Sequence, residues 1–527
     1  MQQLPPYGRG DAIRPAGLFE AVLAAVTIFC GMAAEVVATR SVVVVTRPPW
    51  VDEIFTLLLV REPSARNAFA ALASGVESHP PAFHAVLRLY AAMTGRVCTV
   101  DFRIITAAFV GLALLGIYLI CRRCVSVIPA VAAVLLVWSR PVVIHNAFEL
   151  RFYGPLLAAS VWFAYLLILS RRGVRGARIP LAIIAAFLCT VHYFGVLSLC
   201  CIWAGDWVAN RRGWREVAAD SWPLLAGLLA VAACVPLALS QRHGTSVGSW
   251  IARPSAANVV PYLKGFYPGA IIPGMVLFAA VSALIRRIRR VDRSEYPRPA
   301  WRDFGGLLGL AAIPFALVAM SFAGQPAMVE RYAIAVAAVL APAAALLVAR
   351  MNQPLRILAC ILLVVSGVQG LRGEKGEAAQ QIAFEKRIAG LAAELRALPP
   401  DGGPIVFQSP HDLFPMAWVA PELGPRLYSL DVDRPDSVGG EQMASAIFCR
   451  DLCRLDAHYL RFPQLMPLND LAASRHFYWV GNAGLAGFQR NFDQATAGFA
   501  ARPVSKSVLG MTRSGESVTR PSALHAP

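Results

Sequence analysis

The sequence predicts an all-α polytopic membrane domain of about 11 transmembrane helices, followed by a small extracytoplasmic α/β domain. Three observations lead to this fold class. The 527 residues are 57% hydrophobic and only 15% charged, and the mean hydropathy of +0.54 is far above that of a soluble domain. Apolar runs alternate with short basic connections up to about residue 370. Beyond that point charge, glycine and proline increase, and no segment is long enough to span a bilayer.

The first apolar run covers residues 17–39 and is predicted to be an uncleaved membrane anchor, because many further spans follow it. A long loop from residue 40 to residue 101 comes next. Its two short apolar pieces, residues 55–60 and 83–93, are interpreted as helices that lie on the membrane surface.

The remaining apolar segments are long enough to cross the bilayer, with one exception. Only about 32 residues separate Arg178 from Arg211, which favours two short helices joined at a recessed outer turn around His192. A single long helix is the alternative, and it would invert every later loop. The further spans are predicted at residues 103–121, 126–145, 154–170, 179–192, 222–240, 271–285, 305–322, 332–349 and 355–368, with one more short helix after Gly195.

The formal net charge of +17 raises the question of nucleic-acid binding. Most clustered arginines lie in short connections, at residues 122–123, 171–178, 211–215 and 286–302. That pattern is typical of cytoplasmic loops under the positive-inside rule, so no nucleic-acid partner is expected and membrane lipids surround the chain. The opposite loops, which carry Asp52, are then extracytoplasmic.

From residue 371 onward the sequence predicts a soluble domain, so the domain boundary is placed between residues 1–370 and 371–527. An amphipathic helix is expected at residues 376–397, and strands at residues 404–408, 426–430 and 477–480. Cys449 and Cys453 are compatible with a disulfide or with two separate thiols.

The predicted outer loops collect acids, histidines and cations that face one compartment. The site residues named for chemistry are Asp52, Glu53, Glu77, His79, Glu149, Arg151, Tyr153, His192, Lys264, Glu330, Arg331 and Tyr332. Such a set suits the transfer of a sugar from a phosphate-linked donor. The acceptor hydroxyl needs a carboxylate base, the oxocarbenium-like transition state needs negative charge nearby, and the departing phosphate needs arginine, lysine or a divalent cation.

Asp52 suits the base because it stands directly after the first span. If residues 50–56 are helical, Glu53 points elsewhere, as a metal, hydrogen-bond or structural partner. His79 precedes Pro80-Pro81 and is either a site residue or the cap of a surface helix. Arg151 and Arg331 are either phosphate ligands or interface anchors that reach toward lipid headgroups. Lys264 is a further candidate for phosphate contact.

Five motifs occur in the order found in one family. They are the acidic pair within residues 50–56, Glu77-Ser78-His79-Pro80-Pro81, Glu149-Leu150-Arg151-Phe152-Tyr153, Val191-His192-Tyr193-Phe194-Gly195 and Glu330-Arg331-Tyr332. Over roughly residues 15–370 the chain resembles the glycosyltransferase family 39-like branch of the GT-C superfamily. Protein O-mannosyltransferases and lipid A aminoarabinose transferases are its better-known members.

The resemblance implies an inverting transferase of a bacterial cytoplasmic membrane, which uses a polyprenyl-phosphate sugar and acts on a lipid, glycan or protein hydroxyl. It implies that Asp52 is essential, that Arg331 and Arg151 contact donor phosphate, and that Glu77 or His79, with His192, binds a divalent metal cation. No nucleotide cofactor is expected, because the chain has no Gly-rich phosphate loop.

Two other function classes compete with this interpretation. A polytopic transporter or lipid flippase predicts internal repeats and charged residues at mid-membrane, whereas here the charges lie at span ends and in loops. A catalytically inactive scaffold predicts that Asp52 is replaceable without loss.

Overall fold

The computed structural model describes most of the chain. The described residues are 17–38, 45–210, 221–244, 254–266, 281, 301–324, 327–349, 351–400, 403–407, 410–431, 454, 457–481, 496, 499–505 and 507–513. The predicted span at residues 271–285, apart from residue 281, and the pair Cys449 and Cys453 lie outside them.

Contacts divide the chain into two compact units. Unit 1 consists of Met1–Thr46, His79–Pro236 and Ile251–Ala379, and unit 2 of Arg47–Ser78, Leu237–Trp250 and Gln380–Pro527. By contacts, the first half of the long loop therefore groups with the C-terminal region. The boundary predicted at residue 370 assigned the whole loop to the membrane domain, and it stays a prediction.

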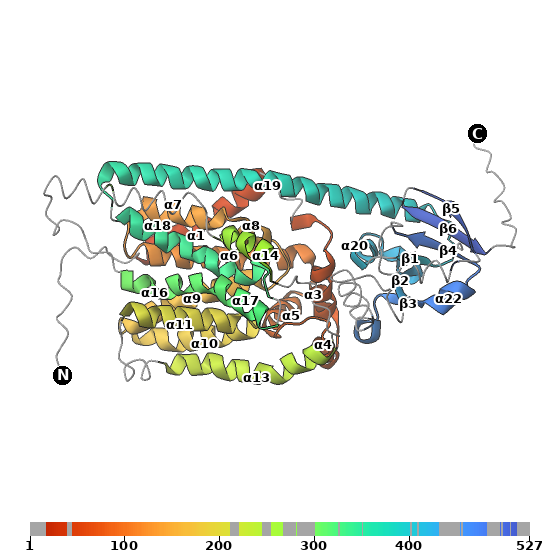
Figure 1. Cartoon of the computed structure of the whole chain (residues 1–527), viewed down its shortest axis with the longest axis horizontal. Coiled ribbons are helices and arrows are strands. Elements are labelled where there is room, and N and C mark those ends of the chain that lie inside the picture. Colours follow the sequence, from red (N-terminus) through yellow and green to blue (C-terminus); the bar gives the residue numbers. More distant parts are fainter. Residues whose placement is uncertain are drawn as a thin grey trace. The chain divides into compact units, whose positions relative to one another are not determined.

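Unit 1 is a bundle of helices (Figure 1). Glu20 accepts hydrogen bonds from Tyr118 and Arg122, which ties the first helix to the second predicted span. The helices are α1 (Leu18–Ala38), α5 (Ala82–Thr94), α6 (Thr99–Cys121), α7 (Val127–Trp138), α8 (Pro141–Ala147), α9 (Tyr153–Arg171), α10 (Arg178–Val191), α11 (Gly195–Asn210), α14 (Ala256–Phe266), α16 (Gly305–Gly309), α17 (Ile313–Phe322) and α18 (Leu340–Ala349), with the 3-10 helix η5 (Glu330–Val339) before α18.

Within the described ranges, five helices are long and apolar enough to cross a membrane, or six if the bent pair α7 and α8 counts as one. That pair bends by 74°, at the point where Ser139 and Arg140 precede Pro141, which cannot continue the α7 hydrogen-bond ladder. Shorter apolar helices lie at Leu18–Ala34, Arg178–Val191 and Gln353–Ser366. The predicted number of spans and their orientation stay predictions.

The short helices α10 and α11 confirm the two-helix interpretation of residues 178–211. His192, Tyr193 and Phe194 form the turn between them, and the Gly195 amide donates to the His192 carbonyl at 2.8 Å. A β-carbon on Gly195 would collide with the Leu188 carbonyl. The backbone can therefore reverse here only because residue 195 is glycine.

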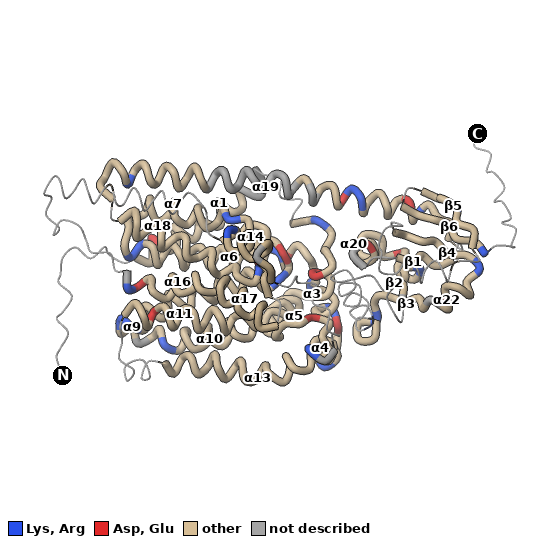
Figure 2. Tube along the Cα trace, in the orientation of Figure 1, with Lys and Arg blue, Asp and Glu red and all other residues tan. Residues whose placement is uncertain are grey.

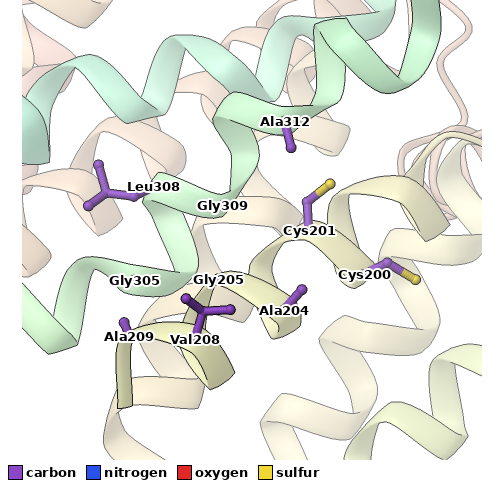
Figure 3. A pocket seen from close by; sticks show the side chains of 10 residues that line it. All are labelled: Cys200, Cys201, Ala204, Gly205, Val208, Ala209, Gly305, Leu308, Gly309 and Ala312. Atoms are coloured by element: carbon purple, nitrogen blue, oxygen red, sulfur yellow. The ribbon is translucent and has the colours of Figure 1, made fainter. Parts of the chain in front are cut away.

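Glycines also set the packing of α11 on α16. A β-carbon on Gly305 would lie 2.7 Å from the Gly205 carbonyl oxygen, and one on Gly205 would lie 2.8 Å from the Gly309 α-carbon. Small residues at such positions let two membrane helices approach closely. Figure 3 shows the apolar hollow beside this contact, which Cys200, Cys201 and Leu308 help to line.

Charged residues of unit 1 lie mostly at helix ends (Figure 2). Asp303, which is 6% exposed, accepts from Arg171 at 2.8 Å and from Arg172, and its carboxylate lies 3.5 Å from Nε of Arg123. Arg171 also donates to Asp206 at 2.7 Å. This buried network joins the ends of α6, α9 and α11 to the segment before α16.

We expect Asp303→Asn to lower the free energy of unfolding by about 3–5 kcal/mol, because Arg123 and Arg171 would keep their largely buried charges without their shared partner. An unfolding titration with SDS in mixed micelles measures this. The matched control is Asp101→Asn, whose partner Arg96 is 64% exposed, and it should cost about 1 kcal/mol or less. Equal losses in the two variants would contradict the assigned role.

Unit 2 contains a six-stranded sheet of order β3-β2-β1-β4-β6-β5. The pairs β1–β2, β2–β3 and β1–β4 are parallel, whereas β6 pairs antiparallel with both β4 and β5. The strands are β1 (Ile405–Phe407), β2 (Leu427–Asp431), β3 (Gln464–Pro467), β4 (His476–Val480), β5 (Phe499–Pro503) and β6 (Val508–Arg513). The three predicted strands correspond to β1, β2 and β4 and are confirmed.

Alternating side chains of the sheet form two cores. Ile405, Phe407 and Val480 pack on one face with helices α19 (Gln353–Arg396) and α20 (Pro410–Val419). Val406 and Phe477 pack on the other face, with Leu471 of helix α22 (Leu468–Ala473). Helix α19 is continuous from the last predicted span to the predicted helix at residues 376–397, because no proline interrupts residues 355–396.

Candidate active site

Aromatic and imidazole rings from four segments of unit 1 form a cluster. His79 lies just before α5, Phe152 lies directly before α9, His192 lies in the α10–α11 turn, and Tyr332 lies in η5. Ring centroids of His79 and Phe152 are 3.9 Å apart, those of Phe152 and His192 are 4.6 Å apart, and those of His192 and Tyr332 are 5.5 Å apart. Four of the five sequence motifs thus contribute to one cluster, although they are far apart in the chain.

Two arginines belong to the same ring cluster. The Arg151 guanidinium lies over the Phe152 ring at 4.9 Å, and the Arg331 guanidinium lies over the Tyr153 ring at 5.6 Å. Arg151 is only 5% exposed. Such rings hold a guanidinium by cation–π attraction and exclude water from it, which strengthens its interaction with an anion.

His192 is a neutral hydrogen-bond donor at this place. Its Nδ1 accepts from the Phe194 amide at 3.0 Å, so in the neutral ring the proton is on Nε2. Nε2 is buried and has no hydrogen-bond partner among the described residues. Burial first, and then the charges of Arg151 and Arg331, lower the pKa of His192 to about 3. The same causes, burial first, hold the pKa of His79 well below its ordinary value.

We expect the stability of the protein to fall as the pH is lowered from 6.5 toward 3. In this window the unfolded state binds a proton at His192 that the folded state refuses, so the slope reaches about 1.4 kcal/mol per pH unit for one histidine. Thermal unfolding in detergent at several pH values measures it. His192→Gln should flatten the dependence, whereas His458→Gln, at an exposed position, should not. A parent midpoint that is constant between pH 6.5 and pH 4 would contradict the prediction.

The acidic pair lies at the start of helix α3 (Val51–Arg61) in unit 2. Glu53 is fully buried, accepts from the Trp50 amide at 3.2 Å and lies 3.7 Å from Arg47. It therefore caps the helix and balances a buried cation, in agreement with the structural role considered for it. Asp52 is partly exposed in the first turn, where the helix dipole favours a negative charge.

Glu77 is held by the same unit. Its carboxylate accepts from the Thr56 hydroxyl at 2.9 Å, and its carbonyl accepts from the Gln241 amide at 3.0 Å. Glu77 is 4% exposed. Gln241 belongs to helix α13 (Trp222–Gly244). A segment distant in sequence therefore holds the backbone of Glu77 beside α3.

The other predicted site residues take three kinds of position. Tyr153 lies in the ring cluster, 6.4 Å from Tyr332. Glu149 lies in the turn between α8 and α9. Glu330 approaches Gly265 of α14. Lys264 is exposed on the same helix, and among the described residues no contact joins it to the ring cluster.

The metal site stays a prediction, because Glu77 belongs to unit 2 whereas His79 and His192 belong to unit 1. Among the described residues, no group of three or more histidine, cysteine, aspartate or glutamate side chains is arranged to hold an ion. The Nδ1 lone pair of His192 is also occupied by the Phe194 amide, so in this conformation the ring offers a proton instead of a lone pair. His192 therefore does not offer Nδ1 to a metal in this conformation, and the proposed reaction uses no metal.

Several residues of these arrangements were not named from the sequence. Phe152 and Phe194 belong to the quoted motifs, so the motifs could have suggested them. Thr56 also belongs to a quoted motif, residues 50–56. Arg47 and Gln241 carry no sequence signal, because their partners are set by tertiary packing.

No protein-family model matches the chain, and a search of curated proteins gives no match. Solved structures do match it, among them two of one protein. The crystal structure of ArnT from Cupriavidus metallidurans in the apo state has a TM-score of 0.56 and 12% identity, over 92% of this chain and 98% of ArnT. The structure of the same protein bound to undecaprenyl phosphate has a TM-score of 0.51 and 12% identity, over 94% and 98%. The chain therefore has an ArnT-like fold.

Proposed function

We propose that the chain is an inverting glycosyltransferase that moves a sugar from a polyprenyl-phosphate donor to a hydroxyl group of a lipid, glycan or protein. The observation that carries this proposal is the ring cluster of unit 1, in which Arg151, Arg331 and the Nε2–H of His192 offer positive charge and a buried donor. The ArnT-like fold, seen with undecaprenyl phosphate in one of the matching structures, supports a polyprenyl carrier as the source of the phosphate.

The proposed reaction has one proton transfer and one displacement. The Asp52 carboxylate takes the proton of the acceptor hydroxyl, and the acceptor oxygen forms a bond to the anomeric carbon. The bond between that carbon and the phosphate oxygen breaks, and polyprenyl phosphate leaves with the electron pair. Arg151 and Arg331 stabilise the charge on the leaving phosphate, and His192 donates a hydrogen bond to it. Attack from the face opposite the leaving group inverts the anomeric centre.

The proposed location is the bacterial cytoplasmic membrane, with the acidic pair on the extracytoplasmic side. The ArnT-like fold and the apolar helices support a multi-pass membrane protein. The side follows from the basic connections of the sequence under the positive-inside rule.

The test is radiolabelled sugar transfer by the purified protein in detergent. A panel of polyprenyl-phosphate sugars serves as donors, a membrane extract serves as acceptor, and each assay is run with and without a chelator. Transfer that survives the chelator supports the proposed reaction, which uses no metal. Chelator-sensitive transfer would restore Glu77, His79 and His192 as metal ligands. Absence of transfer from every donor, together with donor translocation in proteoliposomes, would favour the flippase alternative.

A further inference from the structure

Helix α3 presents an apolar stripe on one side. Val51, Ile54, Phe55 and Leu58 follow the spacing i, i+3, i+4 and i+7, which places them on one face of a helix. The first three are no more than 7% exposed. This burial does not come from a membrane span, because α3 has only 11 residues. Another part of unit 2 must cover this face.

The cover is the C-terminal domain. Phe414 of α20 is 1% exposed and packs with Val51, Ile54 and Phe55 in one core cluster, to which Phe462 and Leu465 add their side chains. The rings of Phe55 and Phe414 meet edge to face at 5.2 Å, and Phe414 and Phe462 do so at 5.3 Å. Helices α3 and α20 lie close together (Figure 1). They share one hydrophobic core, although about 360 residues separate them in the chain.

Two further contacts hold the segment that follows the stripe. The Arg61 guanidinium lies over the Trp418 ring at 4.0 Å. The Asn67 side chain donates to the Tyr459 carbonyl at 2.8 Å. Both partners again belong to the C-terminal domain, so α3 and the start of helix α4 (Ala65–Ser74) are attached to that domain at several points.

The opposite side of α3 is also fixed. Glu53 is paired with Arg47, and Thr56 donates to Glu77. Asp52 lies between these two sides, in the first turn and three residues before Phe55. Its carboxylate position is therefore determined by how α3 sits on α20.

We propose that the C-terminal domain is the platform that positions Asp52, with Phe414 as the positioning residue. The catalytic consequence rests on the proposed function, in which Asp52 is the base; the structural part does not. A small misplacement of a reacting group can lower a rate by about a hundredfold. In this proposal the domain acts on the chemical step through the position of Asp52.

The experiment compares Phe414→Ala with Phe384→Ala in the full-length protein. Phe384 is a partly buried phenylalanine of α19 in the main core of the same domain, so its loss removes a similar volume away from α3. Phe414→Ala should lower kcat about 10- to 100-fold while KM for the donor stays within twofold. Phe384→Ala should change kcat less than threefold. Phe414→Leu, which refills most of the space, should restore at least half of the parental kcat.

A double substitution separates this contact from general loss of folding. If Phe55 and Phe414 act through each other, Phe55→Ala with Phe414→Ala should lower kcat no more than the worse single variant does. Multiplied losses would overturn the proposal. So would an equal loss of kcat in Phe384→Ala, because that would show a merely structural role.

The position of residue 52 can be read without any enzymatic activity. In an Asp52→Cys background, the rate at which a charged maleimide modifies the introduced thiol is followed by peptide mass spectrometry. Adding Phe414→Ala should change that rate at least threefold, and adding Phe384→Ala should not. An unchanged rate overturns the platform. A changed rate, together with no sugar transfer by the parent protein, which keeps Asp52, overturns the proposed function alone.

Discussion

Replacement of Asp52 by asparagine is expected to lower the rate of sugar transfer by about two to four orders of magnitude, the usual contribution of a general base. Asparagine keeps the size of the side chain but cannot accept the proton of the acceptor hydroxyl. Helix α3 should keep its start, because Glu53 and not Asp52 accepts from the Trp50 amide. The initial rate of radiolabelled transfer at saturating donor measures the effect.

The matched control for Asp52→Asn is Glu62→Gln, the same change of carboxylate to amide at the other end of α3. Glu62 accepts from the Ser64 amide at 3.1 Å and is partly exposed. We expect its replacement to change the rate less than twofold. Equal rates for the parent and Asp52→Asn would remove Asp52 from the mechanism and leave the inactive scaffold as the better interpretation.

Local patterns predicted the elements whose formation depends on neighbours in sequence. The apolar pieces at residues 55–60 and 83–93 are helical in α3 and α5, and the two short helices around His192 are confirmed. Each of these segments has either the helical apolar period or a length limit set by flanking arginines. Such signals survive in a single sequence.

Long-range pairing could not be predicted in the same way. Strand β3 has no alternating apolar pattern to reveal it, with a burial order of exposed, intermediate, intermediate and exposed residues. It exists because β2 pairs with it in parallel. The apolar stripe of α3 suggested a helix on the membrane surface, yet Phe414 covers it. An apolar face on a helix predicts that this face is buried, but it does not identify the partner that covers it.

The candidate site shows the same division. Motif order united His79, Arg151, His192 and Tyr332 in one hypothesis. The structure places the rings of His79, His192 and Tyr332 and the guanidinium of Arg151 in one cluster. The role of Glu53 as a cap follows from its position three residues after Trp50. The contact of the Glu77 carboxylate with the Thr56 hydroxyl, in contrast, was not predicted. Only tertiary packing decides such a contact.

Joint replacement of Arg151 and Arg331 by glutamine is expected to raise KM for the polyprenyl-phosphate donor by roughly a hundredfold or more. A hydrogen bond to a charged group contributes about 1.5–3 kcal/mol, so two of them account for at least that factor. Steady-state kinetics with donor varied at fixed acceptor measure it. The pKa of His192 should rise toward its ordinary value in the same variant, because both arginine charges lower it in the parent.

Arg140→Gln is the matched control, since Arg140 donates to the Gly265 carbonyl in the same unit without lying over a ring of the cluster. It should leave KM for the donor within twofold. Arg331→Lys separates charge from geometry: lysine keeps the charge but loses the planar fork that binds phosphate in two places, so an intermediate KM is expected. If KM rises as much in Arg140→Gln as in the double variant, the arginines act as membrane anchors. An unchanged KM for the donor in the double variant would show that Arg151 and Arg331 do not bind its phosphate. The ring cluster would then not be the phosphate-binding site.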